Sequence, residues 1–153
     1  MIALGSNLGN RHAHLGDAIG RLTDAFGPLT ISSPHETEPV DVPLPQSPFL
    51  NMAVVGSTTR SPAATLTLLL EVERELGRER PFPGAPRTID LDLILYGDAV
   101  LSQPGLEVPH PRFRERLFVL EPLVEIAPTF RDPVSGLTVA ALLERLRRKR
   151  QNG

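Results

Sequence analysis

The chain has 153 residues, of which 41% are hydrophobic and 22% charged, and its formal net charge at pH 7 is -2. This length favours a single domain over residues 1–153, because two separate domains would each be marginally stable; the mixed charges exclude a disordered chain and give no reason to expect a nucleic-acid partner. Because the sequence has no cysteine, disulfides, zinc-thiolate sites and thiol nucleophiles are excluded, and any metal must bind oxygen or imidazole ligands, which favours magnesium or manganese.

The sequence contains no signal for a membrane or for export. No apolar run approaches the roughly 20 residues that span a bilayer. Residues 1–5 lack the basic and apolar regions of a signal peptide. We therefore expect a cytoplasmic protein without a membrane partner, and we expect a monomer.

Apolar spacing and turn residues predict the elements in chain order. They are a strand at 2–4, a helix at 8–26, strands at 29–32 and 49–55, a helix at 61–77, a strand at 88–96, a short hairpin or irregular excursion at 99–109, helical turns at 112–127 and a helix at 137–148. The second helix has the clearest start, because Ser61 is a good cap and Pro62 suits the first helical position. Most of the sixteen prolines lie between these elements and predict stiff loops.

The order strand, helix, strand, strand, helix, strand is typical of one fold. It predicts an α+β, ferredoxin-like sandwich, in which an antiparallel sheet carries its helices on one face. The other face would then be open for an active site.

Asp90 and Asp92 lie one residue apart in the predicted strand 88–96. Because side chains alternate along a strand, both carboxylates project to one face, while Ile89 and Leu91 project toward the helices. Two close carboxylates repel each other unless a cation neutralises them, and Mg²⁺ accepts one or two carboxylates together with water and substrate phosphates. An isolated Asp-x-Asp is more often a solvated strand face, and metal-dependent glycosyltransferases share the tripeptide.

Three arginines near this pair favour a metal site. Arg87 directly precedes the strand, and Arg78 and Arg80 lie on the loop before it. Guanidinium groups neutralise the non-bridging oxygens of a polyphosphate bidentately. Together with the carboxylates, they predict a magnesium-dependent phosphoryl-group transferase.

Three further polar residues are candidates, each with a structural alternative. Glu73 lies on the apolar stripe of its helix and needs a partner, so it either orients an arginine or touches a nucleotide, or it reaches water at the helix edge. Asn51 stands in an apolar strand, where an amide either reads the edge of a heterocycle or is satisfied structurally. His110, between two prolines, either binds a phosphate or is an ordinary loop histidine.

Several segments, in order along almost the whole chain, carry a family resemblance. They are residues 3–9, 36–39, 49–51, 73–78, 85–93, 108–111 and 118–128. The most specific is the run Pro-Arg-Thr-Ile-Asp-Leu-Asp at 86–92. Together these segments resemble the 6-hydroxymethyl-7,8-dihydropterin pyrophosphokinase family of folate biosynthesis.

The resemblance implies a ferredoxin-like fold and transfer of a whole pyrophosphoryl group from ATP to the pterin hydroxymethyl oxygen, with release of AMP. Asp90 and Asp92 would bind two Mg²⁺ ions. The residues implied for ATP are Glu73, Arg78, Arg80, Arg87, His110 and Arg116. Those implied for the pterin are Thr37, Pro39, Val40, Phe49, Asn51 and Phe118. Arg78, Arg87 and Asp92 would be the catalytic residues, with Asp92 assisting deprotonation of the substrate hydroxyl and no protein nucleophile.

Two alternatives come from other classes. One is a catalytically silent ferredoxin-like module that binds a nucleotide or a protein on its open face. The presence of Asn51, Arg87 and both aspartates argues against it. The other is a glycosyltransferase, for which the chain is too short to hold the usual nucleotide-binding domain.

Overall fold

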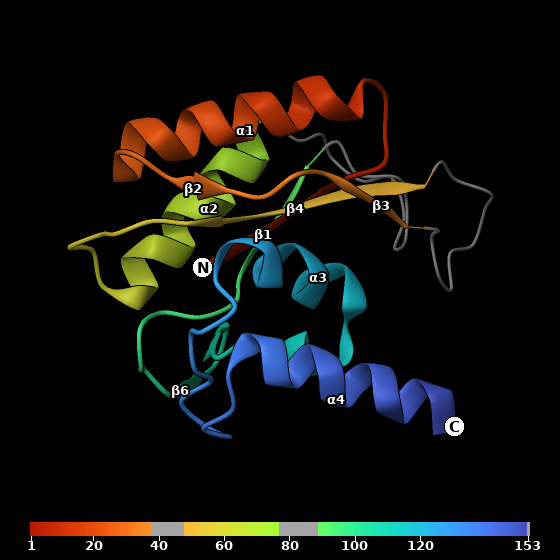
Figure 1. Cartoon of the computed structure of the whole chain (residues 1–153). Helices are drawn as coiled ribbons and strands as arrows, with labels where there is room; N and C mark the ends of the chain where they lie inside the picture. The colour runs from red at the N-terminus through yellow and green to blue at the C-terminus, as the bar shows by residue number, and fades with distance from the viewer. Residues whose placement is uncertain (38–47, 77–88, 153) are drawn as a thin grey trace.

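The computed structural model describes residues 1–37, 48–76 and 89–152 (Figure 1). Within these ranges the elements are β1 (Ile2–Ser6), α1 (Arg11–Phe26), β2 (Thr30–Ile31), β3 (His35–Thr37), β4 (Phe49–Val55), α2 (Pro62–Leu76), β5 (Asp90–Leu93), β6 (Leu101–Gln103), β7 (Leu106–Val108), a 3-10 turn η1 (Phe113–Glu115), α3 (Leu117–Ile126) and α4 (Val139–Asn152). None of the helices in these ranges has the length and apolar character needed to cross a membrane.

The larger sheet is antiparallel, and β1 lies at its centre. The strand order is β2–β4–β1–β5, and β3 pairs with β4 along the same edge as β2. This order, with α1 between β1 and β2 and α2 between β4 and β5, confirms the predicted ferredoxin-like class. β4 has its predicted bounds, whereas β5 ends at Leu93, opposite Ile2, the first residue of β1. The carbonyl of the next residue, Ile94, accepts a hydrogen bond from His110 N (2.9 Å).

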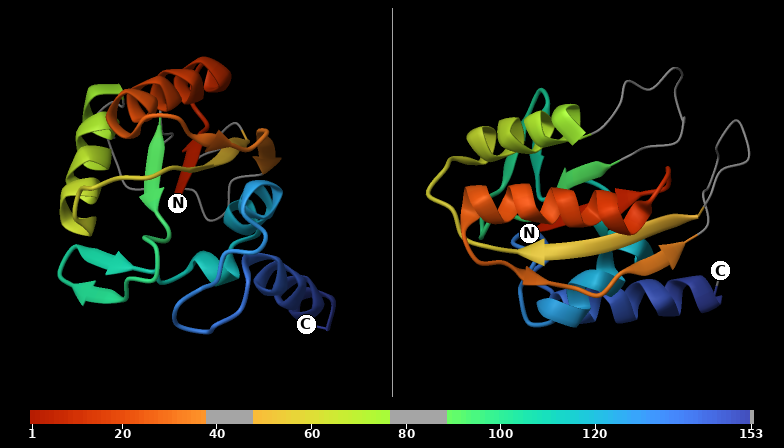
Figure 2. Two further views of the ribbon diagram at one scale, coloured as in Figure 1. Left: turned by 60° about the vertical axis from the view of Figure 1, so that its left-hand side comes forward. Right: turned by 90° about the horizontal axis from the view of Figure 1, so that it is seen from above.

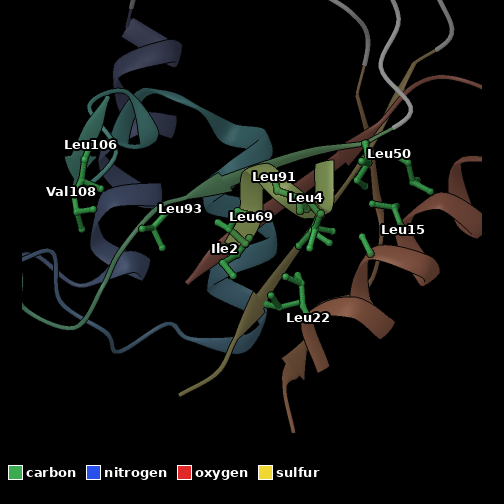
Figure 3. Close-up of a cluster of buried hydrophobic side chains, with 14 residues drawn as sticks. Ile2, Leu4, Leu15, Leu22, Leu50, Leu69, Leu91, Leu93, Leu106 and Val108 are labelled. Atoms are coloured by element: carbon green, nitrogen blue, oxygen red, sulfur yellow. The ribbon is translucent and has the colours of Figure 1, made fainter. Parts of the chain in front are cut away.

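Helices α1 and α2 cover one face of this sheet. Alternate residues of the central strands, such as Leu4 and Leu91, meet Leu15 of α1 and Leu69 of α2 in a buried apolar cluster (Figure 3). Each leucine buried there stabilises the fold by about 1.5–3 kcal/mol. The strand alternation expected from the sequence is therefore confirmed, and the residues between these leucines face the other side.

Among the described residues, the opposite face is covered except at one end, and α3 and α4 lie on it (Figure 2). With η1 they form a second apolar cluster, in which Ala3 and Ala53 of the sheet meet Phe113, Leu120 and Leu143. The two alanines are small enough to let these helices approach the sheet closely. α1 and α2 thus cover one face as predicted. The prediction that the other face is free is only partly correct, because α3 and α4 form a third layer that covers part of it.

The edge strand formed by β2 and β3 is interrupted by a bulge. Ile31 lies opposite Val54. Further along, His35 lies opposite Asn51. The four steps from Ile31 to His35 on the edge strand therefore match only three steps, from Val54 to Asn51, on β4. The edge strand has one extra residue, which is accommodated near Pro34, a residue without a backbone N–H for the ladder.

A buried carboxylate fixes the segment before α4. The Asp132 side chain is fully buried and accepts hydrogen bonds from Arg114 Nε (2.5 Å), Arg114 Nη2 (2.8 Å) and Ser135 Oγ (2.7 Å). Burial alone would raise the pKa of Asp132, but the bonds from Arg114 and Ser135 outweigh it and hold the pKa well below its usual range. Because Arg114 belongs to η1, this pair anchors the turn between His110 and Arg116.

Replacing Asp132 with alanine should lower the free energy of unfolding by about 3 kcal/mol at neutral pH, because it leaves Arg114 without its partner. The pKa of Asp132 is lower in the folded than in the unfolded state, so its contribution is complete above the unfolded value of about 4 and is lost as the pH falls toward the folded value. Urea unfolding of the wild type and of Asp132→Ala at neutral pH and at about pH 3 measures the loss of unfolding free energy and its dependence on pH.

The matched control is Asp98→Ala, since Asp98 is exposed in the turn after β5. It should change the free energy of unfolding by less than about 0.5 kcal/mol. A destabilisation by Asp132→Ala that is the same at both pH values would contradict the role assigned to the carboxylate.

Candidate active site

Strand pairing brings both aspartates and Asn51 to the open end of the sheet face. Gly5 of β1 lies between Asp90 on one side and Asn51 on the other. Asp92 lies opposite Ala3, on the same face. Both carboxylates are half-buried, as expected for the open face, while Leu91 between them is buried in the first cluster.

Glu73 lies at the outer edge of β5, and its partner is a backbone group. Its Oε2 accepts a hydrogen bond from Leu91 N (2.7 Å), on a side of β5 where the described residues form no further strand. Burial, and then the charges of Asp90 and Asp92 and a hydrogen bond with Asp90, raise the pKa of Glu73 to about 7, although the bond from Leu91 acts to lower it. Glu73 therefore lies close enough to the aspartates to respond to both.

The donor chemistry of this edge fits a divalent cation bound together with a phosphate. Three carboxyl groups concentrate negative charge there, and a cation would relieve their repulsion. Within the described ranges, no set of three or more His, Cys, Asp or Glu side chains is grouped to hold a metal ion. Asp90 and Asp92 would thus supply two protein ligands and leave the remaining positions to water and phosphate oxygens, as Mg²⁺ prefers.

His110, predicted to contact ATP, lies close enough to Arg116 and Asp90 for their charges to act on it. Burial lowers the pKa of His110, and the charges of Arg116 and Arg112 lower it further, while Asp90 opposes the shift. His110 Nδ1 accepts a hydrogen bond from Arg112 N (3.1 Å). In the neutral ring the proton is therefore on Nε2, which makes that atom a hydrogen-bond donor.

The side of this open end formed by β3 and β4 carries the residues expected to bind the pterin. Asn51 is buried, and its Nδ2 donates to Thr37 Oγ1 (2.7 Å). Phe49 lies opposite Thr37 in the pairing of β3 with β4. A methyl group on Gly5 would lie 3.3 Å from Asn51 Oδ1 and 3.6 Å from the Phe49 ring. The glycine thus leaves room above the sheet beside an amide and an aromatic ring.

Phe118 is the second aromatic residue predicted for the pterin. It lies in the first turn of α3 and is 38% exposed, which is unusual for a large apolar side chain. The guanidinium of Arg116 lies 5.5 Å from the centre of its ring. An exposed ring and a cation are therefore adjacent at the start of α3.

Five predicted site residues lie outside the described residues. They are Pro39, Val40, Arg78, Arg80 and Arg87. Their assigned contacts with substrates remain predictions.

Arg11 makes contacts near the site that were not predicted from the sequence. Its Nη1 donates to Glu36 Oε1 (2.8 Å) and to Pro48 O (2.7 Å), so α1 is tied to β3 and to the residue just before β4. An arginine in the first turn of a helix is disfavoured by the helix dipole. That unfavourable position is the signal in the sequence that Arg11 has an acceptor elsewhere.

Comparison with known proteins gives a family over most of the chain. Residues 1–128 match the family described as 7,8-dihydro-6-hydroxymethylpterin-pyrophosphokinase (HPPK). The 2-amino-4-hydroxy-6-hydroxymethyldihydropteridine pyrophosphokinase of Bacillus subtilis is 46% identical over 127 residues, which are 82% of this chain and 75% of that protein. The Synechocystis protein of the same name is 39% identical over 148 residues, covering 95% of this chain and 75% of that protein.

Solved structures resemble the fold at low sequence identity. The crystal structure of wild-type Plasmodium falciparum HPPK-DHPS with SDX-DHP has a TM-score of 0.74 and 14% identity, and it covers 98% of this chain. This chain spans only 45% of that longer chain, so the likeness concerns the fold of one part of it. From the match over residues 1–128 and the two bacterial relatives, the chain belongs to the 7,8-dihydro-6-hydroxymethylpterin-pyrophosphokinase family.

Proposed function

We propose that this chain transfers the pyrophosphoryl group of ATP to the hydroxymethyl oxygen of 6-hydroxymethyl-7,8-dihydropterin, with magnesium held by Asp90 and Asp92. The observation that carries the proposal is the register of β1. It brings the aspartates and Asn51 together at the open end of one sheet face. In the reaction, the hydroxymethyl oxygen bonds to the β-phosphorus of ATP, the bond from that phosphorus to the α-phosphate breaks, and AMP leaves.

The groups on the nucleotide side bind and orient a highly charged substrate. A magnesium ion would neutralise phosphate charge at Asp90 and Asp92. His110 donates from Nε2 to a phosphate oxygen, and Arg116 contributes a full positive charge beside the N-terminus of α3. The partial positive charge of that helix end acts in the same direction.

The groups on the pterin side hold the acceptor in place. Phe49 and Phe118 contact the faces of the ring, and the Asn51 amide hydrogen-bonds its polar edge. Positioning of this kind supplies much of the catalysis in phosphoryl transfer, because little covalent help from the protein is required. We assign to Asp92 the assistance in removing the proton of the hydroxyl group, and no protein nucleophile takes part.

Incubation of the chain with ATP, Mg²⁺ and 6-hydroxymethyl-7,8-dihydropterin should yield AMP and the pterin pyrophosphate in equal amounts. Separation of the nucleotides by anion-exchange chromatography measures this directly. ADP as the product would reject transfer of a whole pyrophosphoryl group. The absence of any product would favour a silent binding module instead.

Asp90→Asn and Asp92→Asn should each lower kcat/KM by about 100-fold or more, since each removes a negative charge that holds the metal. Their melting temperatures should stay close to that of the wild type, because both side chains lie on the open face. Addition of EDTA to the wild-type protein should stop turnover, and excess Mg²⁺ should restore it. The control is Asp24→Asn, an exposed position on α1 across the sheet; full activity in either site variant would exclude the metal assignment.

Asn51→Ala should raise KM for the pterin about tenfold and leave KM for ATP within about twofold, because one set of hydrogen bonds to the pterin is lost. His110→Ala should instead raise KM for ATP about tenfold and leave KM for the pterin within about twofold. Steady-state kinetics with each substrate varied in turn separates the two. Equal changes in both KM values for Asn51→Ala would contradict the assignment of Asn51 to the pterin.

A further inference from the structure

The bulge in the edge strand decides which side chains of β3 reach the pterin side. β3 has only three residues, and a short edge strand has few ladder hydrogen bonds of its own. An uninterrupted register from β2 would bring Glu36 opposite Phe49, whereas the bulge brings Thr37 there. A shift of one residue turns every later side chain to the other face. The position of Thr37 beside Asn51 therefore depends on the bulge.

Side chains hold the bulge together with one backbone bond, from Ser32 N to Ala53 O (2.9 Å). Ser32 Oγ accepts a hydrogen bond from Ala53 N (2.9 Å). Glu125 of α3 accepts three more, from Ser33 N (2.6 Å), Ser33 Oγ (2.6 Å) and His35 Nε2 (3.0 Å). The bonds from Ser33, and then the one from His35, lower the pKa of Glu125 to about 2, so the carboxylate is charged at neutral pH.

The segment that Glu125 holds also orients Asn51. Asn51 Nδ2 donates to Thr37 Oγ1 (2.7 Å) and, over a longer distance, to His35 O (3.4 Å). Two acceptors on one nitrogen fix the plane of the amide. The direction of Oδ1, which lies beside Gly5 on the open face, is then fixed as well.

We propose that Glu125 is a positioning residue for the pterin substrate. By binding Ser33 and His35 it fixes the register of β3, and through Thr37 it sets the orientation of the Asn51 amide. This inference rests on the proposed role of Asn51 in binding the pterin. Glu125 itself makes no contact with the substrate.

The kinetic test compares variants of two glutamates on α3. Glu125→Ala should raise KM for 6-hydroxymethyl-7,8-dihydropterin about fivefold and leave KM for ATP within about twofold. Glu125→Gln keeps one acceptor oxygen and should give a smaller increase. The matched control is Glu121→Gln, one turn earlier, where the carboxylate lies 3.5 Å from Arg147 of α4; it should leave both KM values unchanged. An equal rise of both KM values in Glu125→Ala would overturn the inference.

A double-mutant cycle separates positioning from general stabilisation. If Glu125 acts through Asn51, then Glu125→Ala should raise the pterin KM by less than about twofold in an Asn51→Ala background. The same fivefold rise in both backgrounds would overturn the inference. The two proposals fail differently: an ineffective Asn51→Ala would reject both, whereas an effective Asn51→Ala with an ineffective Glu125→Ala would reject only the role of Glu125.

A spectroscopic measurement does not depend on turnover. The side-chain amide of Asn51 should give a shifted pair of ¹⁵N–¹H signals in Glu125→Gln and keep its wild-type position in Glu121→Gln. Glu125→Gln serves here because it is the more conservative variant and remains usable should the alanine variant fail to fold. An unchanged Asn51 signal in Glu125→Gln would overturn the inference.

Discussion

The central strand β1 pairs antiparallel with β4 on one side and with β5 on the other, and these two ladders determine which residues share a face. Because side chains alternate with a period of two, the register that buries Leu4 and Leu91 beneath α1 and α2 also turns Gly5 and Asp90 to the opposite face. The apolar core and the candidate site are therefore two results of one pairing. A slip of one residue in β5 would bury both aspartates and expose the leucines, at a cost of several kcal/mol.

The helix α3 packs on this face of the sheet. Arg116 precedes its first turn and lies beside Phe118, and Glu125 lies in its last turn, where it binds Ser33 and His35 at the edge of the sheet. Ten helical residues span about 15 Å. Apolar contacts of α3 with Ala53 of β4 hold the helix against the sheet. The third layer thus brings side chains of α3 to the edge of the candidate site.

Much of this arrangement follows from local patterns in the sequence. The alternation around Asp90 predicts the face of both carboxylates, and the cap at Ser61 predicts the start of α2, because both are decided within a few neighbouring residues. The later end predicted for β5 and the position of α3 depend on distant contacts, such as the hydrogen bond from His110 N to Ile94 O, which no local pattern contains. The bulge also depends on distant contacts. Pro34 indicates a break in the ladder, but the acceptor that holds the bulge, Glu125, lies ninety residues from His35 in the sequence.

Two side-chain contacts hold the short strand β3 from its two faces. On the helix-covered face, Arg11 of α1 binds Glu36. On the site face, Glu125 of α3 binds His35. A strand of three residues at a sheet edge is not stable by itself, so its conformation is set by the helices on either side rather than by its own ladder. The amide of Asn51 takes its orientation from this strand, so the geometry at Asn51 depends on side chains of α1 and α3 that hold β3 from either side.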